Sequence, residues 1–101
     1  MIRRGTTPEQ VFNTSIDLSE ATVLYVTYRQ WGKNVIEKKL DDCTVTSTSV
    51  SFYLSQEETL LLDVKHPDVE IQIRAKFGDQ TAVASNIIKT TVGAILKDGL
   101  I

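Results

Sequence analysis

Apolar and polar side chains alternate without interruption along residues 69–77, whose sequence is VEIQIRAKF. An alternation with a period of two places the apolar side chains on one face of a β-strand and the polar side chains on the other. The run therefore predicts a strand with one face buried and one face in solvent. It sets the fold class, because no segment of about ten to twelve residues shows sustained helical periodicity.

The first half of the chain is predicted to form an antiparallel meander. Residues 10–16 are predicted as an edge strand, because Pro8 favours extended backbone before it and cannot donate a hydrogen bond within a sheet. Residues 22–30 are rich in β-branched and aromatic side chains on both faces, which favours a central strand. A turn at residues 31–34 follows, since glycine and asparagine tolerate positive φ, and residues 35–40 form the return strand.

A second turn signal, Asp41-Asp42, precedes two further short segments with strand character, residues 43–46 and 49–54. The alternation then stops at Ser55. Ser55 followed three residues later by Glu58 is the capping-box pattern of a helix start. We expect one short helical turn that ends at about Leu62.

The last hairpin joins residues 69–77 to a long final strand over residues 81–92, through a tight connection at 78–80. Ile87 and Ile88 are adjacent apolar residues, and they predict a bulge or a switch of the buried face. About six or seven strands with one helical turn predict an all-β chain, an immunoglobulin-like antiparallel β-sandwich in a single domain over residues 1–101. A small open barrel is the structural alternative.

Composition excludes several functional classes. The chain has 101 residues, 11 basic and 13 acidic, with the two signs interleaved. No basic patch for nucleic acid or for an acidic lipid surface is apparent, so we expect neither nucleic acid nor a membrane as a partner. Cys43 is the only cysteine, which excludes an internal disulfide. The first residues lack the apolar stretch of a cleavable signal, so we expect synthesis in the cytoplasm without a signal peptide.

No constellation of catalytic residues can be assembled from the sequence. His66 is the sole histidine and has no sequence-defined carboxylate or serine partner. Cys43 and His66 together are too few ligands for a zinc site. The acidic pairs Asp41-Asp42 and Glu57-Glu58 are better explained by a turn and by a helix N-terminus. We therefore expect no enzyme activity, no cofactor and no metal.

Trp31 is the most suggestive single side chain for binding. It lies at a predicted hairpin tip close to Tyr28, where an exposed aromatic ring could anchor a partner or stack on a sugar. The alternative, which we favour on sequence grounds, folds Trp31 back over the end of the sandwich, because aromatic residues usually complete small cores.

The last nine residues carry more apolar weight than an idle tail, through Ile95, Leu96, Leu100 and Ile101. We expect these side chains to be buried, either across their own domain or on a neighbouring subunit. The candidate interaction surface from sequence therefore comprises Trp31, Tyr28, Leu100 and Ile101.

Three segments, RRGTTP at residues 3–8, LSQEETL at 54–60 and SNIIKTTVGAILKDGLI at 85–101, together with VEIQIR, resemble a family of small proteins of Firmicutes prophages and gut phages. The similarity runs nearly end to end. After Thr7-Pro8 the family often continues with Thr-His-Thr-Phe, whereas this chain has Glu-Gln-Val-Phe, so only Phe12 carries over and no role of that histidine transfers.

The resemblance implies a non-enzymatic structural or accessory protein of a phage or prophage, similar to the β-sandwich domains of tail and baseplate proteins. Its expected partners are other virion or prophage proteins and further copies of itself as a homo-oligomer. It implies synthesis in the bacterial cytoplasm and a final place in the virion. The alternative function, based on Trp31, is a carbohydrate or surface-ligand binding module.

Overall fold

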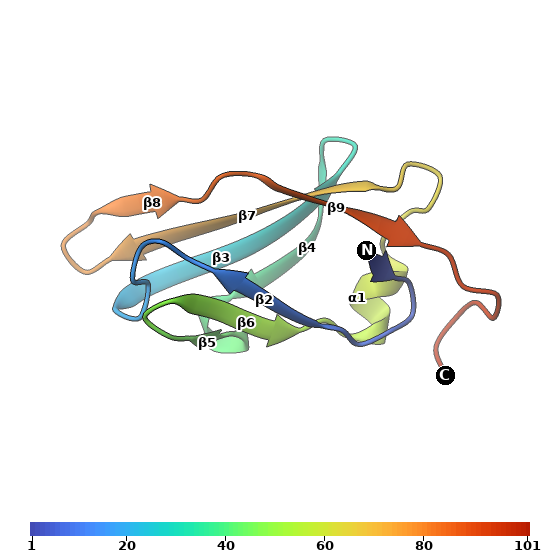
Figure 1. Ribbon diagram of the computed structural model, residues 1–101, viewed down its shortest axis with the longest axis horizontal. Coiled ribbons are helices and arrows are strands. Elements are labelled where there is room, and N and C mark those ends of the chain that lie inside the picture. The colour runs from blue at the N-terminus through green and yellow to red at the C-terminus, as the bar shows by residue number, and fades with distance from the viewer.

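The computed structural model describes residues 1–101 as two β-sheets packed face to face, with one short α-helix at one end (Figure 1). The strands are β1 (Ile2–Arg3), β2 (Glu9–Asn13), β3 (Ala21–Gln30), β4 (Lys33–Lys39), β5 (Thr44–Val45), β6 (Ser49–Tyr53), β7 (Asp68–Phe77), β8 (Ala82–Ala84) and β9 (Ile88–Gly93). A 3-10 helix, η1, covers Leu40–Asp42, and the α-helix, α1, covers Gln56–Leu60.

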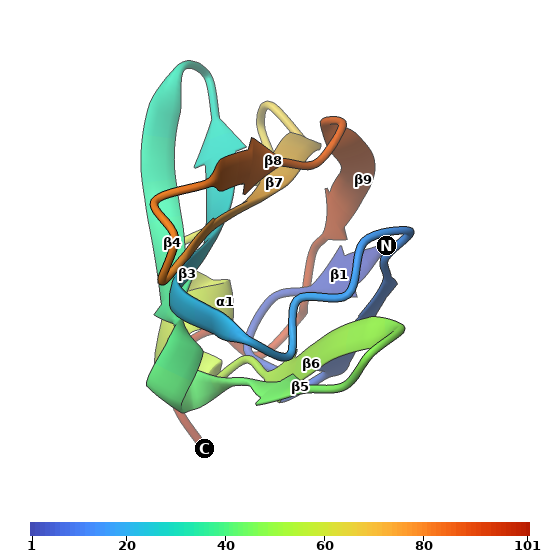
Figure 2. The same ribbon diagram turned by 90° about the vertical axis from the view of Figure 1, so that its left-hand side faces the viewer.

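The order of the strands is that of an immunoglobulin-like sandwich. The larger sheet runs β1-β9-β7-β3-β4, with β8 beside β7, and the smaller sheet runs β2-β6-β5. In the usual strand letters, β9, β7, β3 and β4 correspond to G, F, C and C′, and β2, β6 and β5 correspond to B, E and D. The two sheets are separate and lie one over the other (Figure 2), so the predicted sandwich is confirmed and the open barrel is excluded.

The core lies between the two sheets and is filled by alternate residues of their central strands. Buried side chains of β3, β6 and β7 make up most of it: Leu24, Val26, Tyr28, Val50, Phe52, Val69, Ile71 and Ile73. Phe52 of the smaller sheet meets Tyr28 of the larger sheet edge-on, with ring centroids 6.3 Å apart. Apolar and aromatic packing therefore joins the sheets without the disulfide found in antibody domains.

Local sequence signals place the connections where they were predicted. The β3–β4 hairpin turns at Trp31 and Gly32, both with positive φ, 56° and 71°. Ser55 caps α1: its hydroxyl accepts from the Glu58 N–H at 3.1 Å, and the Glu58 carboxylate accepts from the Ser55 N–H at 2.9 Å. β2 pairs only with β6, so the predicted edge strand is present, over Glu9–Asn13. The predicted meander of the first half is wrong, because β2 and β5 pair with β6 in the smaller sheet whereas β3 and β4 lie in the larger one.

The final strand differs from the prediction, because it is split in two. β8 and β9 both pair with β7, and the chain leaves the sheet between them. Ser85 fills the gap: its N–H donates to the Ile73 carbonyl at 2.8 Å and its Oγ accepts from the Ile73 N–H at 3.0 Å. The irregularity expected at Ile87 and Ile88 is therefore present, and it separates two short strands instead of bending one long strand.

Candidate functional site

Trp31 projects from the tip of the β3–β4 hairpin and is 73% exposed. Its ring stacks on the His66 imidazole, with ring centroids 3.4 Å apart and the planes inclined by 27°. The interpretation in which Trp31 folds over the end of the sandwich is wrong. Trp31 is the first residue of a two-residue turn with positive φ, and this turn directs the side chain away from the sheets toward the loop before β7.

Gln30 fixes the loop that supports this stack. Its side chain is only 6% exposed, and its Nε2 donates to the carbonyls of Asp63 (2.9 Å) and His66 (3.0 Å). Its Oε1 accepts from the Asp63 N–H at 2.8 Å. Sequence reasoning missed Gln30, although the period of two along β3 places it on the same inner face as Tyr28.

A hollow of about 510 Å³ adjoins the stacked rings. Its lining residues are Trp31, Gly32, His66, Pro67, Asp68, Val69, Glu70 and Lys89. The hollow therefore combines an exposed aromatic face with charged groups of both signs. Such a combination is suited to stacking on a sugar ring or on a flat side chain while hydrogen bonding at its rim.

Tyr28 does not belong to this surface, which corrects the sequence-based assignment. It is fully buried on the inner face of β3, and its hydroxyl donates to Gln10 Oε1 at 2.8 Å. Burial raises the pKa of Tyr28 far above its ordinary value, and the nearby Glu58 carboxylate adds to that rise. Tyr28 and Trp31 are close in sequence, but strand alternation turns Tyr28 inward while the turn carries Trp31 outward.

The apolar tail, residues 94–101, is not buried by its own domain. Ile95 is the exception. Its side chain packs so closely on Gly5 that a β-carbon added to Gly5 would lie 2.9 Å from Ile95 Cδ1. Leu96, Leu100 and Ile101 are exposed. Leu100 and Ile101 therefore remain candidate interaction residues, whereas burial against their own domain is excluded for these two.

Polar contacts at the surface hold the tail in place. The Arg4 guanidinium lies 3.1 Å from the Asp98 carboxylate. The Gln56 side-chain amide donates to the Ile101 carbonyl (3.2 Å) and accepts from the Ile101 N–H (3.0 Å). Solvent-exposed contacts of this kind contribute little each, so the tail is weakly attached.

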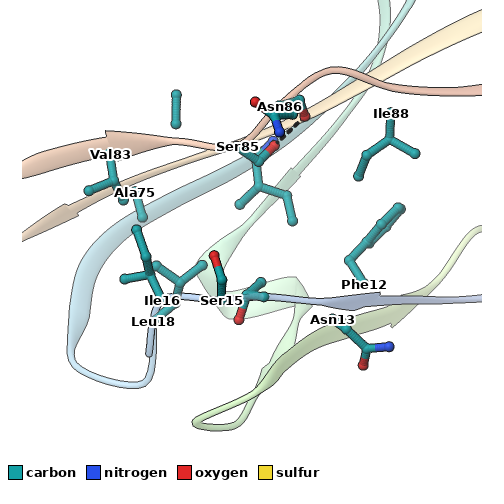
Figure 3. A pocket seen from close by; sticks show the side chains of 13 residues that line it. Phe12, Asn13, Ser15, Ile16, Leu18, Ala75, Val83, Ser85, Asn86 and Ile88 are labelled. Atoms are coloured by element: carbon teal, nitrogen blue, oxygen red, sulfur yellow. Dashed lines mark hydrogen bonds between the residues drawn. The ribbon is translucent and has the colours of Figure 1, made fainter.

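A groove opens between the two sheets on the side where β2 faces β8 and β9 (Figure 3). It has a volume of about 330 Å³. It is lined by Phe12, Asn13, Thr14, Ser15, Ile16, Leu18, Ile73, Ala75, Val83, Ala84, Ser85, Asn86 and Ile88. We call it the edge groove. Sequence reasoning missed it because its two walls come from strands about 70 residues apart, and only the edge position of β2 was a signal.

One carboxylate of each acidic pair has a structural partner. Asp42 Oδ2 accepts from the Lys39 N–H at 3.0 Å at the start of η1. Glu58 caps α1 and also lies 2.7 Å from the Lys38 ammonium. No three histidine, cysteine, aspartate or glutamate side chains gather in a way that could hold a metal ion. No helix of the chain is both long and apolar enough to cross a membrane.

No protein-family model and no curated protein matches the chain. Among solved structures, it is similar to the immunoglobulin-like domain of mouse leukocyte-associated immunoglobulin-like receptor 1, crystallised as a strand-swapped dimer. The two chains are 16% identical, the match covers 94% of this chain and 85% of the receptor domain, and the TM-score is 0.46.

Proposed function

We propose that this chain is a non-enzymatic interaction module, an assembly component of a phage or prophage particle. The observation that carries the proposal is the exposure of Leu96, Leu100 and Ile101 on a tail that, beyond Ile95, the domain holds only by exposed polar contacts. The assignment to a phage particle is supported by the resemblance of the segments RRGTTP, LSQEETL and TVGAILKDGLI to prophage proteins.

The physical reason is the free energy available from burial of the tail. Covering a leucine or isoleucine side chain contributes about 1.5–3 kcal/mol. Leu96, Leu100 and Ile101 leave this contribution unused in the isolated domain. A repeated virion component needs only modest interfaces, because many copies in one particle sum weak contacts through multivalency.

Co-fractionation with particles tests this proposal. The chain carries an affinity tag and is expressed in its source bacterium during prophage induction, and purified particles are assayed for it. We expect the wild-type chain in particles and a loss of about tenfold for the Leu100→Asp/Ile101→Asp variant. The matched control is Lys97→Asp, which changes the net charge equally and removes no apolar side chain. Absence of the wild-type chain from particles and from assembly intermediates contradicts the proposal.

A second candidate function is the binding of a carbohydrate or another surface ligand, favoured by the exposed Trp31–His66 stack beside its hollow. Trp31 is the only tryptophan, so its fluorescence reports on this site alone. We expect a glycan ligand to shift the emission and Trp31→Ala to abolish binding. Tyr53→Ala removes another exposed aromatic ring, on the smaller sheet, and should bind normally. An emission spectrum unchanged by every member of a glycan panel rejects this candidate.

A further inference from the structure

One wall of the edge groove is an open strand edge. β2 pairs with β6 alone, and the flanking bonds Leu54 N–H to Pro8 carbonyl and Thr14 N–H to Thr48 carbonyl show which residues face β6. Backbone groups alternate in direction along an antiparallel strand. The N–H and carbonyl groups of the intervening residues Glu9, Val11 and Asn13 therefore point to the open side, where no strand pairs with them.

The opposite wall is open as well. β1 covers the outer edge of β9 only at Val92 and Gly93. β8 pairs with β7 and has no partner on its other side. The edge that runs from β8 through Ser85 to Ile88 is therefore also without a strand partner. Two open edges on opposite sides of one groove are suited to an extended backbone, which pairs with such edges in β-augmentation.

The floor of the groove favours apolar side chains on a strand that enters it. Leu18, Ile73 and Ala75 are buried beneath it, and Phe12 and Ile16 line it further. A cavity of roughly 150 Å³ holds one benzene-sized group, so 330 Å³ accommodates about two large aliphatic side chains. Thr14 Oγ1 is buried without a hydrogen-bond partner, and the backbone of an inserted strand would supply one.

The exposed tail has the chemistry that the groove requires. Residues 96–101 contain three aliphatic side chains, and two of them, Leu96 and Leu100, lie on the same face when the segment is extended. Six extended residues span about 20 Å, comparable to the roughly 17 Å of the five-residue β2. The segment forms no strand or helix in its own domain, and its backbone bonds there only to the Gln56 side chain, through Ile101.

The tail and the groove lie on different halves of a molecule 47 Å long (Figure 1). β9 starts at Ile88 on the groove and carries the chain away from it to Gly93. A tail would have to reverse its direction to enter the groove of its own domain. Insertion into a second copy needs no reversal.

We propose that residues 96–101 of one copy insert as an added strand into the edge groove of a second copy, with Leu96 and Leu100, which share one face of an extended strand, directed at its apolar floor. This inference rests on the proposed function as an assembly module and names the partner as a second copy of this chain. The interface is heterologous, because tail and groove are different surfaces. Repetition of the contact builds an open chain or, where the rotation closes, a ring.

Two complementary variants test the inference in solution. One lacks residues 96–101 and keeps an intact groove, and the other carries Ile16→Asp in the groove and keeps an intact tail. Ile16 is half exposed, so the charge enters the groove with little effect on the core. By sedimentation, the wild-type chain should form concentration-dependent assemblies, and each variant alone should be monomeric. An equimolar mixture of the two should form a one-to-one complex that grows no further.

The matched control is Val11→Asp. Val11 lies on β2 beside the groove, but its side chain is on the outer face of the strand, so this variant should assemble like the wild type. A synthetic peptide of residues 93–101 should bind the tail-deleted chain and shift the backbone NMR signals of β2 and of residues 82–88. Insertion of a charge at Ile16 should weaken peptide binding by about tenfold or more.

A wild-type chain that stays monomeric up to about 1 mM overturns the inference. Assembly that survives removal of residues 96–101, or a peptide that shifts signals elsewhere, overturns it as well. If one of these outcomes is found and the chain still co-fractionates with particles, the proposed function stands, and the tail binds a different protein. Absence from particles together with self-assembly in solution rejects the phage assignment and keeps the inference.

Discussion

Tyr28 and Gln30 are two polar side chains on the inner face of β3, and each ties a different part of the molecule to it. Tyr28 donates across the sandwich to Gln10 on β2, which adds a directional contact to the apolar core. Gln30 makes three hydrogen bonds to the loop before β7 and so holds His66 in reach of Trp31. Buried polar groups of this kind are costly to leave unpaired, so each fixes one arrangement of its neighbours.

Tyr28→Phe should lower the free energy of unfolding by about 1 kcal/mol at about pH 7, because it removes one buried hydrogen bond and leaves Gln10 Oε1 without its donor. Urea denaturation followed by circular dichroism measures the difference. A variant as stable as the wild type would show that this hydrogen bond contributes nothing.

The same residue makes the protein sensitive to alkali. The pKa of Tyr28 is raised in the folded state, so the folded protein keeps a proton that the unfolded chain loses above its ordinary value of 10.0. Its stabilising contribution is complete below that pH and is lost as the pH rises further. Tyr28→Phe should therefore show a shallower loss of stability than the wild type between about pH 9 and about pH 11.

Cys43 should react slowly with thiol reagents. Burial raises the pKa of its thiol to about 11, with a further contribution from the nearby Asp42 carboxylate, and the thiol donates to the Lys39 carbonyl at 3.3 Å. A raised pKa lowers the fraction of thiolate but makes the thiolate more nucleophilic, which partly offsets the first effect. We therefore expect Cys43 in the folded protein to react about tenfold more slowly than in the urea-unfolded chain at about pH 8. A chromogenic disulfide reagent measures both rates. Equal rates in the folded and unfolded chain would contradict the prediction.

The alternation along residues 22–30 puts Leu24, Val26 and Tyr28 on one face, and the structure shows that this is the buried face of β3. The assignment of Tyr28 to a surface with Trp31 rests only on their closeness in sequence. The exposure of Trp31 could not be predicted, because a turn residue belongs to no periodic pattern and its direction depends on the turn geometry. The stack on His66 joins residues 35 positions apart, which no local pattern encodes.

At the scale of elements, the longer strands, the turns and the helix cap follow local sequence signals. The shortest strands do not. The final segment has strand character along most of its length, but Ser85 interrupts it and replaces ladder bonds with its own hydroxyl. β1 has two residues, too few to show an alternation, and it exists because the end of β9 offers an open edge. Both features depend on partners that are distant in sequence.

Ser85→Ala should lower the free energy of unfolding by about 1–3 kcal/mol, because it leaves the N–H of Ile73 without an acceptor. Ile73 is buried, so water does not replace the lost partner. Ser85→Thr keeps the hydroxyl and serves as the control. Chemical denaturation and hydrogen exchange at the Ile73 amide measure the effect, and a slow, unchanged exchange rate in the alanine variant would refute it.

At the scale of the whole molecule, the sandwich is stabilised by its core, and the tail is an appendage. Its anchor is Ile95 against Gly5, and its later residues make only exposed polar contacts. The edge groove arises because β2 and the β8–β9 edge bound the same side of the sandwich and no strand of this chain covers it. The fold class therefore follows from sequence, while the surfaces that bear on function follow from assembly of distant segments.

Removal of residues 96–101 should change the free energy of unfolding by less than about 1 kcal/mol, since exposed ion pairs and hydrogen bonds contribute little. Ile95→Ala in the full chain should cost more, about 1–2 kcal/mol, because it removes apolar contact with the domain. Thermal and urea unfolding of the two variants give the comparison. A larger loss on removing the tail would mean that residues 96–101 belong to the folding unit.

The parallel pairing of β1 with β9 has a mechanical consequence. Ile2 and Arg3 lie beside Val92 and Gly93, and both strands run in the same direction. Tension that pulls on the chain at Met1 and beyond Gly93 slides these two strands past one another, so that their hydrogen bonds bear the force together and do not open one after the other. A domain built in this way resists stretching along its own chain and extends only after the hydrogen bonds between β1 and β9 have ruptured.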